Sequence, residues 1–391
     1  MQKRIKPTPG YGNFTATIVT NPRINLRHLS ILISCFLSMH TAKTMPRYLL
    51  AALLLVTPLL SALAQSAPAQ TERHFTFHYG FTVKNVPPGQ RLRVWIPLAH
   101  PDPFQDVKVT AQSGDLPLKQ IRQSEARQSE YGNEVLYAET AKADSAEYQF
   151  HVDYDVVRRE HVVLVDGKPA ARATSAGDRP ALTKLERARF LEPDTLVPIT
   201  GVPAERAAEQ TKGAATPLEK AKDIYDYVFH TMRYDKTGTG WGHGDTLWAC
   251  DSRHGNCTDF HSVFISMARS QGIPARFEIG FPLPIDKSAA EIPGYHCWAE
   301  FYIDSIGWIP VDISEAWKHP EKHVYFFGAH DVNRFQFTEG RDLKLTPAQD
   351  GPPLNYFIYP YVEVGGKEYS NISIDFSFTD AAQEASAGLP K

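Results

Sequence analysis

Cysteine is scarce in this chain: four occur among 391 residues, and no two of them form a Cys-x-x-Cys pair. That absence argues against a zinc finger or ribbon. The sequence also lacks an Asp-x-Asp-x-Asp-Gly calcium loop. The formal net charge is only -3, and no run of Lys and Arg suggests a nucleic-acid surface. We therefore expect no metal, no cofactor and no nucleic-acid partner.

Long hydrophobic runs are also missing, since the apolar stretch from Tyr48 to Leu60 is short for a membrane span. Met45-Pro46-Arg47 precedes it and Ala62-Leu63-Ala64 follows it, the pattern of a secretory signal peptide. We predict a signal over residues 45–64, cleavage after Ala64 and an unfolded upstream segment over residues 1–44, with Met45 as the natural start. The protein is then exported, periplasmic or secreted, and keeps no membrane span; an uncleaved N-terminal anchor is the alternative.

Export affects the cysteines that remain. Cleavage removes Cys35 and leaves Cys250, Cys257 and Cys297, an odd number, so at least one thiol stays free in an oxidising compartment. We expect the free thiol to be Cys257. A disulfide between Cys250 and Cys297 is an open alternative.

Hydrophobic and charged fractions of 42% and 22% are ordinary for a globular protein. Alternating apolar residues predict strands over Phe75 to Val83, Leu92 to Ile96 and Tyr148 to Val156. These runs indicate an antiparallel β-sandwich-like domain over residues 72–157. The segment 158–202 contains several Gly and Pro residues and is predicted to be a linker that wraps the fold without regular structure.

A second domain is expected over residues 203–379. Thr216, Pro217 and Glu219 predict the start of a helix with a capping box. The glycine-rich segment 238–244 that follows this helix either forms one wall of a cleft or merely connects elements. At the C-terminus, the apolar runs 356–364 and 369–378 flank a Gly-Gly turn and predict a hairpin, followed by a disordered tail at 380–391.

The segment Gly255-Asn256-Cys257-Thr258-Asp259 opens a predicted amphipathic helix that ends at Gly272. Its apolar positions recur at steps of three and four and are expected to pack inward: Phe260, Val263, Phe264, Met267 and Ala268. Cys257 lies in the first turn, where the positive end of the helix dipole favours a thiolate and, later, an oxyanion. Because the thiolate is the nucleophilic form, this position favours Cys257 as a nucleophile.

A strand is predicted from His296, with His296, Trp298 and Glu300 on one face and Cys297 on the other, which makes Cys297 a poor nucleophile candidate. A regular hairpin centred on residue 304 then places Asp312 beside His296 on one face, unless a bulge shifts the register. There Asp312 fixes the imidazole tautomer. His296 takes the thiol proton and returns it to the leaving amine.

Each candidate has a plainer explanation: Cys257 as a small buried hydrophobe, His296 as a structural histidine and Asp312 as a turn cap. A metal site is a rival for the same region, although the spacing is not that of a known zinc motif. Its donors would come from a dense set of side chains: His243, Cys250, His254, Cys257, His261, His296 and Cys297. Arg334 and Arg341 are candidate carboxylate binders, or else solvated surface residues.

Four motifs in order carry a resemblance over residues 216–315: Gly255-Asn256-Cys257-Thr258-Asp259, Ala268-Arg269 with Gly272-Ile273-Pro274-Ala275-Arg276, His296-Cys297-Trp298-Ala299-Glu300, and Gly307-Trp308 leading to Asp312. With them the chain resembles the transglutaminase-like superfamily. The resemblance implies an α+β, papain-like catalytic domain behind the β-rich one and a triad of Cys257, His296 and Asp312. Trp248 or Trp241 is a candidate oxyanion donor, as a tryptophan is in some members, or else a core aromatic.

From the resemblance and the residues we expect an exported thiol enzyme that cleaves or transfers the acyl groups of amide bonds through a thioester on Cys257. Its partner is a protein or peptide substrate, which includes cell-wall peptides. Hydrolysis is favoured over transfer because water needs no second binding site. The alternative is a non-catalytic module that binds extracellular peptides or cell-wall material.

Overall fold

The computed structural model describes residues 71–121, 131–170 and 181–382, and every element below lies in these ranges. They belong to one unit, Gln70–Lys391. The predicted signal peptide and its upstream segment lie outside the described residues, as does nearly all of the predicted tail.

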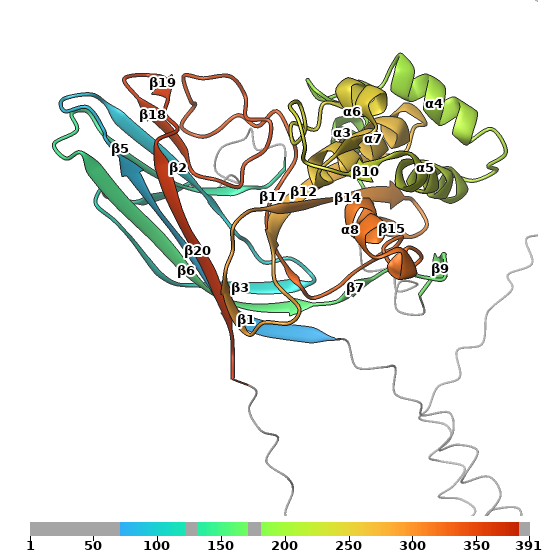
Figure 1. Cartoon of the computed structure of the whole chain (residues 1–391), viewed down its shortest axis with the longest axis horizontal. Helices are drawn as coiled ribbons and strands as arrows, with labels where there is room; N and C mark the ends of the chain where they lie inside the picture. The colour runs from blue at the N-terminus through green and yellow to red at the C-terminus, as the bar shows by residue number, and fades with distance from the viewer. Residues whose placement is uncertain (1–70, 122–130, 171–180, 383–391) are drawn as a thin grey trace, which may run out of the picture. The chain divides into compact units, whose positions relative to one another are not determined.

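Two antiparallel sheets form a sandwich on one side of this unit (Figure 1). The strand orders are β13-β20-β1-β6-β3 and β19-β18-β2-β5-β4. Their bounds are β1 Glu72–Lys84, β2 Leu92–Leu98, β3 Gln105–Gly114, β4 Lys119–Ile121, β5 Glu134–Thr140, β6 Glu147–Arg159, β13 Ala289–Glu291, β18 Tyr361–Val364, β19 Lys367–Glu368 and β20 Ile372–Asp380. The predicted alternation is confirmed in the first half of β1, where Phe75 and Phe77 are buried between more exposed neighbours.

Strands from the far end of the chain complete both sheets. β20 pairs with β1, with Phe77 opposite Phe378, and β18 pairs with β2, with Trp95 opposite Tyr361. The prediction that segments 356–364 and 369–378 form a hairpin with each other is therefore wrong. The Gly-Gly turn instead joins β18 to the short β19, and the chain then crosses to the other sheet, because the exposed edge of β1 offers β20 a longer partner.

A third antiparallel sheet has the order β15-β14-β12-β17. Its strands are β12 Ala275–Pro282, β14 His296–Ile303, β15 Gly307–Val311 and β17 Arg334–Glu339. Phe281 of β12 stacks on Phe77 of β1 with 5.1 Å between ring centroids, and Phe337 stacks on Tyr79 at 5.5 Å. One hydrophobic cluster thus runs from the sandwich into this sheet. Residues 72–157 alone therefore do not complete the hydrophobic core of the predicted β-rich domain.

The helices lie beside the third sheet, where α7 packs on β14 and β12 (Figure 1). They are α3 Lys184–Arg189, α4 Val202–Gln210, α5 Pro217–Thr231, α6 Thr246–Ser252, α7 Cys257–Ser270, α8 Ile313–Lys318 and the 3₁₀ turn η2 Pro320–Lys322. The remaining short strands are β7 His161–Val162, β8 Leu164–Val165, β9 Lys168–Pro169, β10 Arg233–Tyr234, β11 His254–Gly255 and β16 Ala329–His330. The segment 158–202 thus contains regular structure, contrary to the prediction, since a capping box of Thr183 and Glu186 starts α3.

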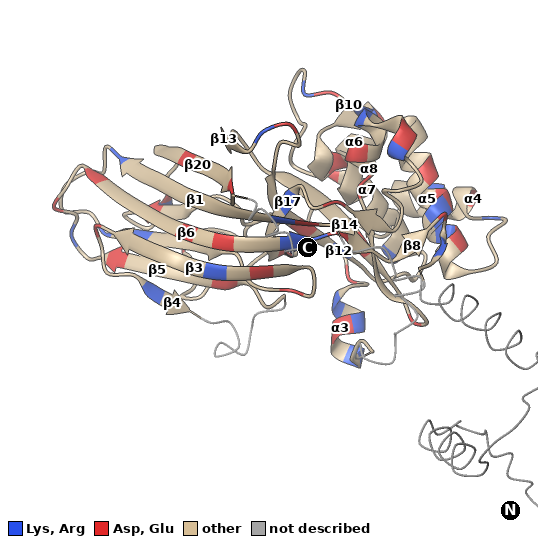
Figure 2. Ribbon diagram, turned by 90° about the horizontal axis from the view of Figure 1, so that it is seen from below, with Lys and Arg blue, Asp and Glu red and all other residues tan. Residues whose placement is uncertain are grey.

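The capping box predicted for α5 is present: the Thr216 side chain accepts from the backbone of Glu219, and the Glu219 carboxylate accepts from the backbone of Thr216. Acidic and basic residues are interspersed on α5 and on the strands β1, β3 and β6 (Figure 2). Within the part of the chain that the structure describes, no helix is both long and apolar enough to cross a membrane.

Helix α7 differs from its predicted amphipathic character, because it is buried on every side. It packs on β14 and β12 and is covered by α4, α5 and α6. Its polar residues are buried as well and have partners inside the protein. For example, Arg269 pairs with Asp194 at 2.7 Å and donates to the carbonyl oxygen of Ala275 at 3.0 Å. α7 is therefore the central helix of this half, and its first turn lies inside the protein.

Candidate active site

Cys257 is the first residue of α7 and is 2% exposed. Asn256 caps the helix, since its side-chain oxygen accepts from the backbone N–H of Thr258 at 2.9 Å. Asp259 completes a capping box by accepting from the N–H of Asn256 at 2.9 Å. Gly255 is required here because a Cβ at this position would come within 2.2 Å of the Asp259 carboxylate. The local sequence thus fixes the thiol at the positive end of the helix.

His296 and Asp312 come from the hairpin of β14 and β15. The pairing of Ile303 with Gly307 centres this hairpin on residue 305, not on residue 304 as predicted. The shift moves Asp312 from opposite His296 to opposite Trp298, which is on the same face, so the expected proximity survives. The Nε2 atom of His296 lies 2.7 Å from Oδ2 of Asp312.

The sulfur of Cys257 hydrogen-bonds to His296. Because Nε2 of the ring faces Asp312, the nitrogen that faces the sulfur is Nδ1. Burial lowers the pKa of His296, but the charge of Asp312 and its hydrogen bond outweigh burial and raise the pKa to about 10. Burial raises the pKa of Cys257, but hydrogen bonds from Cys297 and His296 and the imidazolium charge hold the pKa well below its ordinary value. The geometry therefore favours a thiolate–imidazolium pair.

Asp312 is fully buried and has four hydrogen-bond donors. Oδ1 accepts from the N–H of Glu315 at 3.0 Å and from the Ser314 hydroxyl at 3.1 Å, so Asp312 also caps α8. Oδ2 accepts from His296 and, at 3.1 Å, from the guanidinium of Arg334. Burial raises the pKa of Asp312, but these cationic neighbours hold the pKa well below its ordinary value.

Arg334 was a candidate carboxylate binder in the sequence, and the carboxylate it binds is that of Asp312. It is 2% exposed, so it is not a solvated surface residue, and its guanidinium lies over the Trp298 ring at 4.9 Å. Its role in the site was missed, because β17 begins 22 residues after Asp312 in the chain.

His261 also supports the site, although the sequence suggested only metal binding for it. Its Nε2 accepts from the N–H of Ile313 at 3.1 Å, so Nδ1 carries the proton and donates to the carbonyl oxygen of Cys257 at 2.7 Å. Burial lowers the pKa of His261, in keeping with a neutral ring. This buried imidazole ties the start of α7 to the start of α8. The signal that could have found it is its spacing of four residues from Cys257 on one helix face.

The glycine-rich segment 238–244 is held against α7. The Asp259 carboxylate accepts from the N–H of Gly242 at 2.7 Å and of Gly244 at 2.9 Å. Arg341 donates to the carbonyl oxygens of Gly244 at 2.9 Å and of His243 at 2.8 Å. The segment is therefore held against the first turn of α7, and Arg341 clamps it there. Its role as one wall of a cleft stays a prediction.

The two tryptophans suggested as oxyanion donors lie in or near this segment. The indole N–H of Trp241 donates to the carbonyl oxygen of Gly238 at 3.2 Å. Trp248 packs on His254 with 5.2 Å between ring centroids and lies against Gly240, where a Cβ would come within 2.5 Å of its indole nitrogen. An oxyanion role for either stays a prediction.

The cysteines are not paired as the alternative proposed: Cys250, Cys257 and Cys297 are all free. Cys250 lies on α6, whereas Cys297 faces α7 and hydrogen-bonds to Cys257. In the described ranges, no group of three His, Cys, Asp or Glu side chains converges as metal ligands.

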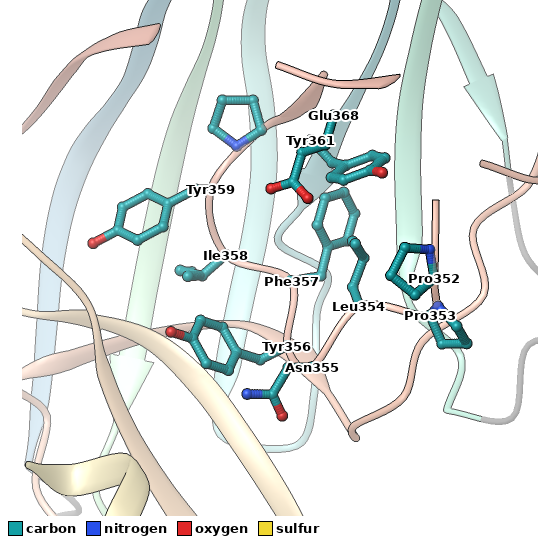
Figure 3. A pocket seen from close by; sticks show the side chains of 11 residues that line it. Pro352, Pro353, Leu354, Asn355, Tyr356, Phe357, Ile358, Tyr359, Tyr361 and Glu368 are labelled. Atoms are coloured by element: carbon teal, nitrogen blue, oxygen red, sulfur yellow. The ribbon is translucent and has the colours of Figure 1, made fainter. Parts of the chain in front are cut away.

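A cavity of about 290 Å³ lies close to the site (Figure 3). It is lined by residues 352–361 and Glu368. Its Tyr356 hydroxyl is 3.5 Å from that of Tyr295, which in turn is 2.9 Å from the hydroxyl of Thr258, the neighbour of Cys257. A chain of three hydroxyls, those of Tyr356, Tyr295 and Thr258, thus runs from the cavity to the residue that follows Cys257.

Residues 204–313 match the model of the transglutaminase-like superfamily. The segment with the thiol and the imidazole is a transglutaminase-like domain. This transglutaminase-like domain has the α+β fold that was predicted, and a solved structure described as a candidate cysteine protease from Cytophaga hutchinsonii shares that fold. The two are 13% identical with a TM-score of 0.50, over 80% of this chain and 98% of that one.

Two further proteins are similar to this chain, and neither similarity bears on its activity. An uncharacterized protein of Haemophilus influenzae is 27% identical over 324 residues, which is 75% of this chain and 85% of that protein. The periplasmic domain of TgpA from Pseudomonas aeruginosa is 15% identical with a TM-score of 0.33, over 68% of this chain and 96% of that one.

Proposed function

We propose that the protein is an exported thiol enzyme that acts on amide bonds of peptides or Gln side chains through a thioester on Cys257. The observation that carries the proposal is the contact of the Cys257 sulfur with His296, whose other nitrogen is 2.7 Å from the buried Asp312 carboxylate. That arrangement supplies a nucleophile, a proton carrier and a group that orients the carrier.

In the proposed reaction, the Cys257 thiolate attacks the amide carbonyl carbon, and the positive end of α7 stabilises the oxyanion that forms. The His296 imidazolium then donates its Nδ1 proton to the leaving amine as the C–N bond breaks, which leaves an acyl thioester. Asp312 holds the ring through Nε2 and stabilises its charged form. Water or an amine, deprotonated by His296, next attacks the thioester carbonyl carbon. The C–S bond breaks, the acid or the new amide leaves, and the Cys257 thiolate is restored beside the His296 imidazolium.

Thiol reactivity tests the proposal without knowledge of the substrate. Iodoacetamide should label Cys257 near pH 6 faster than it labels free cysteine, because the sulfur is already a thiolate. His296→Ala should slow this labelling. Cys250 is an internal control, because burial raises its pKa to about 11. Equal labelling of Cys257 in wild type and His296→Ala would favour the binding module instead.

Hydrolysis and transfer are separated by a fluorescent primary amine added to candidate protein substrates. We favour hydrolysis, so we expect substrate cleavage or deamidation without incorporation of the amine. The rate of substrate cleavage or deamidation should fall at least about 10³-fold in Cys257→Ala. Incorporation that depends on Cys257 would establish transfer.

Export is the remaining part of the proposal and rests on the sequence of residues 45–64. Mass spectrometry of the protein from its native cells should find a mature chain that begins at Gln65. A mature chain that begins well before Gln65 would contradict cleavage.

A further inference from the structure

We propose that Cys297 is a resolving thiol, which forms a reversible disulfide with Cys257 when a peroxide oxidises Cys257. The inference rests on the proposed function in one respect: the disulfide would block Cys257, the nucleophile of the proposed reaction. Its chemical basis is the contact of two thiols, which exists whatever the substrate is.

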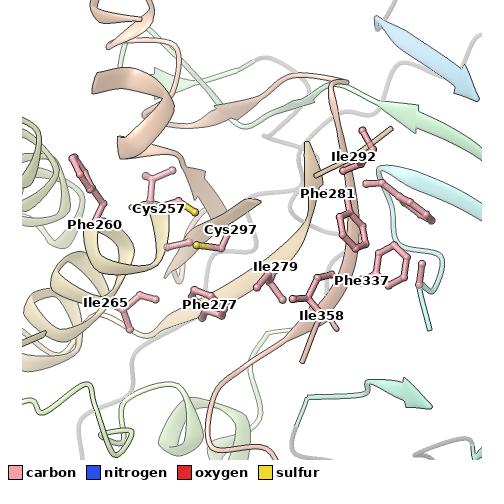
Figure 4. Packing of buried hydrophobic residues seen from close by; sticks show 14 of the residues in the cluster. Cys257, Phe260, Ile265, Phe277, Ile279, Phe281, Ile292, Cys297, Phe337 and Ile358 are labelled. Atoms are coloured by element: carbon pink, nitrogen blue, oxygen red, sulfur yellow. The ribbon is translucent and has the colours of Figure 1, made fainter. Parts of the chain in front are cut away.

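The two thiols lie next to each other between α7 and β14 (Figure 4). Cys297 is fully buried on the face of β14 that packs on α7, opposite to the face of His296. A hydrogen bond joins its thiol to that of Cys257. Its sulfur is also 3.6 Å from the hydroxyl of Thr258 and 4.0 Å from Nδ1 of His261. These contacts hold the Cys297 sulfur beside Cys257 without a place in the proposed proton transfer.

The two sulfurs differ in reactivity. His296 and Cys297 lower the pKa of Cys257, whereas burial and the neighbouring Cys257 thiolate raise the pKa of Cys297 well above its ordinary value. A peroxide reacts with the thiolate in preference to the thiol. Cys257 is therefore the residue that is oxidised first, and Cys297 remains a thiol until it attacks the oxidised Cys257 sulfur.

The reaction has two steps. Hydrogen peroxide transfers one oxygen to the Cys257 thiolate, which is oxidised to a sulfenic acid while the O–O bond breaks and hydroxide leaves. The Cys297 sulfur then attacks the Cys257 sulfur, and an S–S bond forms as the S–O bond breaks. The Cys297 proton leaves with the departing oxygen as water. A dithiol reductant reverses the product to two thiols and is itself oxidised to a disulfide.

Purified wild-type protein treated with hydrogen peroxide and then analysed by non-reducing peptide mass spectrometry tests the proposal. We expect a peptide pair that joins Cys257 to Cys297 and is lighter by two hydrogens. Iodoacetamide labelling of Cys257 should fall at least about tenfold and return after dithiothreitol.

Two variants make the test specific. In Cys297→Ser no resolving thiol is present, so Cys257 should gain two oxygens as a sulfinic acid, and dithiothreitol should not restore labelling. Cys250→Ser should behave as wild type. Three results would overturn the proposal: a disulfide that includes Cys250, wild-type sulfinic acid that accumulates as fast as in Cys297→Ser, or no Cys257 to Cys297 bond at all. Mass spectrometry detects the disulfide itself, so the result does not depend on activity toward amides. The disulfide can form in a protein without amide activity, and it can be absent from an active enzyme.

Discussion

At the scale of single residues, the Asp312 side chain makes several different contacts at once. It caps α8, holds the ring of His296 and pairs with Arg334. The sequence predicted the contact with His296 because both residues fall on one face of a hairpin. It did not predict the contact with Arg334, since that residue comes from a strand on the far side of β12.

Asp312→Asn tests the charge of this residue with little change in its shape. The carboxylate raises the pKa of His296 to about 10, so the imidazolium is present below that pH and is lost as the pH rises through it. Without the carboxylate, the imidazolium is lost at a lower pH and the pKa of Cys257 rises. Iodoacetamide labelling of Cys257 at pH 6 should fall about tenfold or more, and the two rates should converge by about pH 10. Equal rates at pH 6 would contradict this account.

Arg334→Met tests the buried ion pair by its effect on stability. Removing one partner of a buried pair leaves the other charge uncompensated, so the free energy of unfolding should fall by about 3–5 kcal/mol. Urea denaturation followed by circular dichroism measures the change. Arg91→Met is the matched control, because its pair with Glu139 is about half exposed and should contribute little. A change in Arg334→Met no larger than that of the control would refute the prediction.

Among the elements, β12 decides how the third sheet is built. It lies between β14 and β17, and its register with β17 shifts between Ile279 and Gly280. A Cβ on Gly280 would come within 2.0 Å of the backbone oxygen of Phe335. That oxygen cannot rotate away as a flexible side chain can, so the close approach of the two strands requires glycine here.

Gly280→Ala should therefore force β12 and β17 apart. The free energy of unfolding should fall by about 3 kcal/mol, the upper end of the range typical of overpacking. Gly213→Ala is the control, because a Cβ there meets no atom within 4 Å. Urea denaturation of both variants gives the comparison. A Gly280→Ala variant as stable as Gly213→Ala would show that the sheet yields at this point.

The described unit as a whole depends on strands from both ends of the chain. β20 covers the edge of β1, and β18 covers the edge of β2. Without them the aromatic face of β1 would lose part of its cover, including the stacking of Phe376 on Tyr79 at 4.4 Å. The sandwich is thus completed by strands that follow the transglutaminase-like segment in the chain.

A fragment of residues 71–170 should therefore fail to fold, although it contains all of the strands predicted for the β-rich domain. We expect no cooperative thermal transition by circular dichroism for this fragment and a cooperative transition for residues 71–382. Cooperative unfolding of the short fragment would show that the first strands form a domain by themselves.

Local sequence patterns were enough to predict the helix that begins at Cys257, the capping box of α5 and the alternation along β1. Each depends on residues a few positions apart, whose spacing on a helix or strand is fixed by backbone geometry. The same reasoning brought His296 and Asp312 to one face, because a short hairpin leaves few possible registers.

Tertiary structure alone decided which distant segments meet. It paired β20 with β1, put Arg334 on Asp312, placed Cys297 rather than Cys250 beside a second thiol, and buried α7 on every side. Periodicity shows which face of an element is apolar, but many partners can cover such a face equally well. The choice among them depends on the packing of the whole chain, which no local pattern contains.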